Sequence, residues 1–111
     1  MSLRVARALK AAGHAVRVLD LRWLKPLPIE ALLEHAGQVG GVLVVDEGRP
    51  DGSIRDAVMA AMAESQAQRH VRSLTGRDCY IPLGQAAEAV MVTEADIHSA
   101  AQAMLTAQSA D

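Results

Sequence analysis

The apolar run GVLVVDE, at residues 41–47, constrains the fold of this chain more than any other feature. It holds no polar side chain before Asp46. A strand of this kind is typical of a parallel sheet, in which helices cover both faces. On either side of the run, apolar residues recur at three- and four-residue spacing, which predicts helices. The sequence therefore predicts an α/β fold.

Helices and strands alternate along the predicted chain. We expect helices over residues 3–12, 28–37 and 53–66, the third of them with a capping box formed by Ser53 and Asp56. We also expect a final helix capped by Thr93 and Asp96. We expect strands over residues 15–21, 41–47 and 70–76. This order predicts a three-layer α/β/α arrangement around a mostly parallel sheet. The length of 111 residues suits one domain, spanning 1–111.

Composition excludes several classes of protein. The 11 basic residues do not outnumber the 13 acidic ones, and Trp23 and Tyr80 are the only aromatic residues, so nucleic-acid binding is not expected. The longest apolar stretch is too short for a membrane span, and we expect no secretory leader, because no charged-then-apolar segment stands at the first residues. A single cysteine, Cys79, cannot form a disulfide within the chain, which fits the cytoplasm.

No catalytic or metal-binding pattern is present. The four histidines are not spaced as neighbours on a helix, and no Cys or acidic pair completes a metal site. Cys79 is expected to be a plain thiol. The segment GRPDG after the best strand lacks the spacing of a phosphate-binding loop. We therefore expect no catalytic, cofactor-binding or metal-binding residue in this chain.

The end of the best strand is nevertheless a candidate site. Asp46 and Glu47 lie there, and residues 48–53 lead into a helix N-terminus, where free amide groups attract anions. Three alternatives are open for what occupies this helix N-terminus: the chain's own carboxylates, a partner protein, or a small anion. We expect internal capping and name Glu47 as the capping carboxylate.

The loop LRWLKPLP, residues 21–28, is the second candidate. It contains Arg22, Trp23 and Pro26. Its leucines would fill the core if the loop is structural. Alternatively Trp23, a residue type enriched in protein contacts, belongs to an interface.

In their order, four motifs make the chain resemble the C-terminal domain of the transketolase superfamily. They are Asp20-Leu21-Arg22, Pro26-Leu27, the strand-ending Asp46-Glu47, and Thr75-Gly76…Asp78 followed by Ile81-Pro82. The likeness is greatest to the beta-type part of the thiamine-diphosphate-dependent, decarboxylating component of 2-oxoacid dehydrogenases. The resemblance implies that Asp78 and Pro82 join the residues above as interface or structural positions.

The resemblance also implies a parent enzyme. There, thiamine diphosphate and a divalent metal bind to other domains, and this domain serves subunit assembly and docking of the acyltransferase core. It further implies a strand upstream of residue 3, lying between strands 15–21 and 41–47. We therefore expect a fragment of a larger enzyme that forms a homo-oligomer. The alternatives are a stand-alone anion- or ligand-binding module, and the same domain of a transketolase or deoxyxylulose-phosphate synthase.

Overall fold

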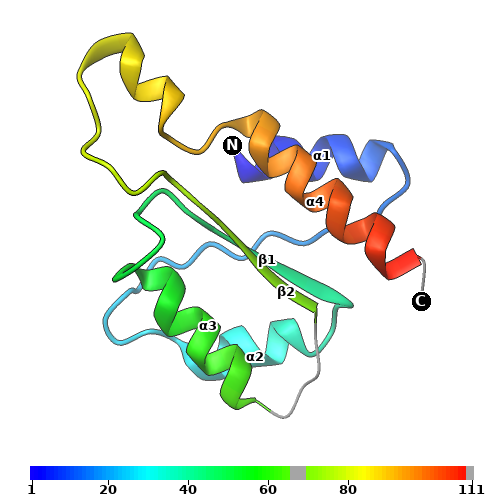
Figure 1. Cartoon of the computed structure of the whole chain (residues 1–111). Helices are drawn as coiled ribbons and strands as arrows, with labels where there is room; N and C mark the ends of the chain where they lie inside the picture. The colour runs from blue at the N-terminus through cyan, green and yellow to red at the C-terminus, as the bar shows by residue number, and fades with distance from the viewer. Residues whose placement is uncertain (66–69, 110–111) are drawn as a thin grey trace.

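The computed structural model describes residues 1–65 and 70–109 (Figure 1). Its helices are α1 (Ser2–Ala11), α2 (Ile29–Ala36), α3 (Ile54–Glu64), the 3-10 helix η1 (Gly84–Ala89) and α4 (Glu94–Ser109). Its strands are β1 (Gly41–Asp46) and β2 (His70–Thr75). The four α-helices and these two strands lie close to their expected positions, although residue 66 of the expected third helix falls outside the described residues.

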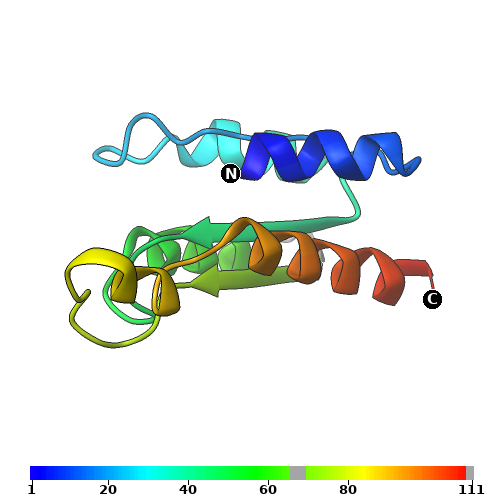
Figure 2. The same cartoon turned by 90° about the horizontal axis from the view of Figure 1, so that it is seen from above.

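The two strands form a parallel sheet that separates two pairs of helices. Their register runs from Gly41 beside His70 to Asp46 beside Thr75. Helices α2 and α3 lie on one side of the sheet, and α1 and α4 lie on the other (Figures 1 and 2). The three-layer α/β/α arrangement and the parallel pairing are therefore confirmed.

Each face of the sheet has its own hydrophobic cluster. On the α2–α3 side, Val44 packs with Leu32, Ala36, Val58 and Met62. On the other side, Val45 and Leu74 pack against a cluster of four buried residues: Val5, Leu9, Val92 and Ile97. Neighbouring residues of a strand point to opposite faces. A strand with helices on both faces therefore needs an unbroken apolar run, which is what β1 has.

Residues 15–21 are not a strand, and the expectation of one there is wrong. The segment has no regular secondary structure and pairs with no strand, and the described sheet contains only β1 and β2. Side chains hold the segment instead: Arg17 contacts the ring of His35 at 3.0 Å and donates to Gln38 at 2.8 Å. An apolar run becomes a strand only where a second backbone is within reach, and that depends on residues far away in sequence.

The N-terminus of α4 has the expected cap. The N–H of Thr93 donates to the Asp96 carboxylate at 3.0 Å, and the N–H of Asp96 donates to the Thr93 hydroxyl at 3.2 Å. The hydroxyl and N–H of Thr93 both donate to Asp96 and hold the pKa of that carboxyl below its ordinary value. This reciprocal pair is a capping box, and it fixes where α4 begins.

Two leucines of α1 test the packing of this helix on the sheet. Leu9 is 1% exposed and Leu3 is 61% exposed. We expect Leu9→Ala to lower the free energy of unfolding by about 2–5 kcal/mol, because it leaves a cavity. Leu3→Ala, the matched control, should change it by less than about 0.5 kcal/mol. Chemical denaturation measures both, and equal losses would mean that α1 does not pack as described.

Candidate functional site

The carboxyl ends of β1 and β2 point to the same end of the molecule. Three loops lie there: residues 20–28 before α2, residues 47–53 after β1, and the long connection after β2. Figures 1 and 2 both show these loops at the end opposite the C-terminus. Because parallel strands start and end together, residues from separate parts of the sequence gather at one edge. We call this region the carboxyl-end face.

Asp46 ties the end of β1 to the start of α3. Its Oδ1 accepts the N–H of Gly48 at 2.8 Å, and its Oδ2 accepts the N–H of Arg55 at 3.0 Å. Partial burial raises the pKa of this carboxyl, but hydrogen bonds, chiefly those from the Gly48 and Arg55 backbone N–H groups, hold the pKa below the ordinary value. An ionised Asp46 therefore occupies the helix N-terminus that was considered for a ligand.

Glu47 does not have the capping role that the sequence suggested. Its side chain is exposed, whereas Asp46 is half-buried and makes the hydrogen bonds. Internal capping is thus confirmed, but the residue was misassigned by one position. In a strand, successive side chains point to opposite sides, so a shift of one residue reverses the direction of the carboxylate.

The first turn of α3 is capped by Asp46 at the end of β1 and not by its own Ser53. Ser53 makes no side-chain capping bond. Asp56 accepts the N–H of Gly52 at 2.7 Å and pairs with the guanidinium of Arg55 at 2.8 Å. Arg55 also donates to the Ser73 hydroxyl at 3.0 Å, which links α3 to β2. The capping box expected at Ser53 and Asp56 is therefore replaced by this network.

Two contacts hold the loops after β1 and β2 against each other. The N–H of Gly76 donates to the carbonyl of Gly48 at 3.0 Å. Gly76 is buried, and an added Cβ would lie 3.1 Å from the carbonyl oxygen of Glu47, so a larger residue would push the loops apart. Nearer the tip, the Arg49 guanidinium carbon lies 5.3 Å from the centre of the Tyr80 ring, a cation–π distance.

The carboxyl-end face exposes large apolar side chains. Tyr80 is 90% exposed and Leu83 is 95% exposed, with Ile81 also exposed beside them. Across the face, Trp23 is 72% exposed. Exposed apolar groups that cluster in one region mark surfaces that contact another molecule.

The seven singled-out residues all lie at this end, but they do not form one cluster. Arg22 pairs with Asp20 at 3.8 Å, and Trp23 and Pro26 are exposed in the same loop. Asp78 is exposed and Pro82 half-buried in the loop after β2. Of the loop leucines, Leu21 and Leu27 pack on the core, whereas Leu24 is exposed. The loop therefore has an anchor in the core and an exposed aromatic tip, and the interface role of Trp23 stays a prediction.

The chemistry of this face favours contact over catalysis. Among the described residues, no three His, Cys, Asp or Glu side chains come together where they could hold a metal ion. Cys79 is exposed in the loop after β2. The perturbed carboxyl at Asp46 is bound to backbone amides, so it is not poised to take up a proton.

Sequence reasoning missed three contributors to this face: Arg49, Tyr80 and Leu83. Tyr80 was visible in the sequence as one of two aromatic residues, in a loop rich in apolar side chains. The pairing of Arg49 with Tyr80 joins loops that are 31 residues apart, and no local signal predicts it.

Residues 1–97 match the family model described as transketolase, C-terminal domain. In addition, no described helix is long and apolar enough to cross a membrane.

Curated relatives cover different parts of the chain. Pyruvate dehydrogenase E1 component subunit beta of Staphylococcus epidermidis is 28% identical over 94% of this chain and 33% of its own length. The 2-oxoisovalerate dehydrogenase subunit beta of Bacillus subtilis is 40% identical over 57% of the chain and 19% of its own length. 1-Deoxy-D-xylulose-5-phosphate synthase of Thermosynechococcus vestitus is 36% identical over 58% of the chain and 10% of its own length. The chain thus spans at most about a third of these relatives.

A pair of isosteric substitutions tests the role of Asp46. Asp46→Asn should lower the free energy of unfolding by about 1–3 kcal/mol, because the amide oxygen is a weaker acceptor and the amide nitrogen faces a backbone N–H. Glu47→Gln, the matched control next to it, should change the free energy by less than about 0.5 kcal/mol. Thermal and chemical denaturation at neutral pH provide the comparison.

The pH dependence of the free energy of unfolding tests the role of Asp46 independently. The folded pKa of Asp46 is lowered, so its stabilisation is complete above the unfolded pKa of about 3.9 and is lost as the pH falls through the folded value. The gap between wild type and Asp46→Asn should therefore be constant above about pH 5 and shrink below about pH 4. A gap that grows on acidification would contradict the assignment.

Proposed function

This chain belongs to the transketolase C-terminal domain family, and we propose that it is the C-terminal domain of a thiamine-diphosphate-dependent 2-oxoacid dehydrogenase. The match to the Staphylococcus relative along nearly the whole chain supports this parent. One observation carries the role of the domain: Tyr80, Ile81 and Leu83 are exposed together in the loop after β2, and Trp23 is exposed in the separate loop before α2. The domain uses this face for assembly with other domains or subunits.

The parent reaction is the oxidative decarboxylation of a 2-oxo acid, with transfer of the acyl group to a lipoyl carrier. Relatives named for pyruvate and for 2-oxoisovalerate support a substrate of the pyruvate or branched-chain type. Docking of the acyltransferase core is a second role of the domain in such an assembly. The single cysteine fits a parent that works in the cytoplasm.

The described residues of this chain do not fit thiamine diphosphate and its metal. They offer no acidic or histidine cluster for a cation, and Asp46 already accepts the Gly48 and Arg55 amides that a phosphate would need. We therefore assign cofactor binding to other domains of the parent enzyme. The same occupied amides argue against a stand-alone anion-binding module.

One alternative parent enzyme, a deoxyxylulose-phosphate synthase, is supported by a specific match. The match to 1-deoxy-D-xylulose-5-phosphate synthase covers more than half of the chain at 36% identity. Reading the coding sequence that flanks this chain separates the candidates. A dehydrogenase-type thiamine-binding domain would support our proposal, whereas synthase-type domains would replace it.

Calorimetry tests the assignment of the cofactor. We expect titration of thiamine diphosphate with Mg²⁺ into the 111-residue chain to give no saturable heat, because its described residues bring together no donor set for the metal ion. Saturable binding in the micromolar range would contradict the proposal, since it requires a site within this chain.

Sedimentation tests the role in assembly. The second edge of β1 pairs with no described strand, and open edges and exposed apolar groups both promote association. We therefore expect the chain to sediment as a homodimer or larger species. Leu83→Ser should shift it toward the 11.8 kDa monomer, whereas Leu3→Ser, the same change at an exposed leucine of α1, should not. A wild-type monomer that is unchanged across concentrations would contradict this role.

A further inference from the structure

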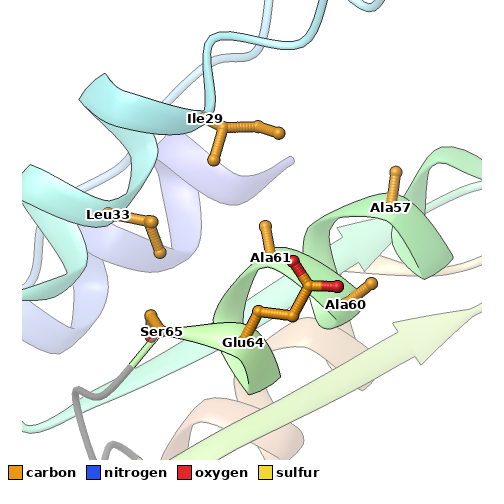
Figure 3. A pocket seen from close by; sticks show the side chains of 7 residues that line it. All are labelled: Ile29, Leu33, Ala57, Ala60, Ala61, Glu64 and Ser65. Carbon is orange, nitrogen blue, oxygen red and sulfur yellow. The ribbon is translucent and has the colours of Figure 1, made fainter.

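A groove lies between α2 and α3, on the outer side of that helical layer. Figure 3 shows the side chains that line it: Ile29, Leu33, Ala57, Ala60, Ala61, Glu64 and Ser65. We call it the α2–α3 groove. Its volume is about 260 Å³, below the roughly 300–1,000 Å³ of small-molecule pockets. This volume suits one or two inserted side chains better than a cofactor.

The two walls of the groove differ in kind. The α2 wall presents the aliphatic side chains of Ile29 and Leu33, one helical turn apart. The α3 wall is formed mainly by alanines, of which Ala57 and Ala60 are exposed. Small side chains allow another backbone to come close, and a spacing of four residues is what a second helix would meet along its length.

The charge around the groove is negative. The carboxylate of Glu64 lies beside Ala60 and Ala61 in Figure 3. Glu30 and Glu34 are exposed and follow Ile29 and Leu33 directly, so they lie one step further round α2. Among the described residues, no cation forms an ion pair with any of these three carboxylates.

Arg55 and His35, the basic residues within α2 and α3, are engaged elsewhere. Arg55 pairs with Asp56 and donates to Ser73 on the side of the sheet. Arg17 contacts His35 and Gln38. A bound molecule that neutralises the rim of the groove must therefore bring its own positive charge.

We propose that the α2–α3 groove binds a basic amphipathic helix of a partner protein. Aliphatic side chains of that helix contact Ile29, Leu33 and the alanines, and its lysines or arginines pair with Glu34 and Glu64. This is the helix-in-groove mode of recognition, in which apolar anchors supply affinity and the flanking charges set the partner's orientation. The groove is lined by α2 and α3, so this binding site is separate from the assembly contacts of the carboxyl-end face.

Nuclear magnetic resonance on the full chain tests the proposal. The probe is an alanine-based helical peptide with leucines along one face and lysines on either side of them. A matched peptide has glutamate in place of each lysine. We expect the lysine peptide to shift the amide signals of Ile29, Leu33, Ala57 and Ala60, with binding that weakens as salt is added. The glutamate peptide should leave these signals unchanged.

Two variants with controls separate the contributions of shape and charge. Ala60→Trp fills the groove and should abolish binding, whereas Ala103→Trp, at an exposed alanine of α4, should not. The double variant Glu34→Gln with Glu64→Gln should weaken binding by about two- to thirtyfold, the range for two exposed ion pairs. Asp51→Asn with Glu88→Gln removes the same net charge away from the groove and should leave affinity unchanged.

Three results would overturn the proposal. The first is equal binding of the lysine and glutamate peptides, or none with about 1 mM lysine peptide. The second is a set of shifted signals that lies outside the groove. The third is a dependence of the groove signals on protein concentration without peptide, because the occupant would then be a second copy of this chain.

Discussion

The carboxylate of Asp46 is the interaction on which the rest of the carboxyl-end face depends. It accepts the amides of Gly48 and Arg55, so it holds the end of β1, the turn after it and the first turn of α3 in one arrangement. A helix N-terminus attracts negative charge through its free amides. Here the chain supplies that charge itself, and the place where many α/β proteins bind an anion is closed.

The consequences of this closure extend along the face. With the turn after β1 fixed, the carbonyl of Gly48 is positioned to accept the N–H of Gly76, and the loop after β2 is held beside it. Arg49 then lies over the Tyr80 ring. Tyr80 and Leu83 are thus exposed on a loop whose base is tethered. A tethered base lowers the conformational entropy that binding must remove, which is consistent with the contact role proposed for this loop.

The fold could be predicted from the sequence where local pattern decides it. The helices, the unbroken strand β1, and the Thr93–Asp96 cap all follow from spacing within a few residues. Prediction failed where a remote group decides the outcome. Residues 15–21 have the apolar content of a strand but no backbone beside them to pair with. At α3, a carboxylate from β1 replaced the local cap expected from Ser53.

The sequence pattern placed Asp46 and Glu47 at the end of the apolar strand, where the structure has them, but not their separate roles. Asp78 and Pro82 were named from the resemblance, and their role as interface positions stays a prediction. Which of two adjacent acidic residues turns toward the helix depends on where β1 ends, to within one residue, and sequence patterns do not have that precision. The Arg49–Tyr80 contact depends on the packing of two loops, for which the sequence carries no periodic signal.

The central claim is that an ionised Asp46 closes the helix N-terminus, so that no anion site is open at this end of α3. Titration of the Asp46 side-chain carbon signal by nuclear magnetic resonance tests it most directly. The account predicts a pKa below the ordinary value of about 3.9, with the Gly48 and Arg55 amide signals shifting at the same midpoint. An ordinary or raised pKa, with amide signals that do not respond, would contradict it.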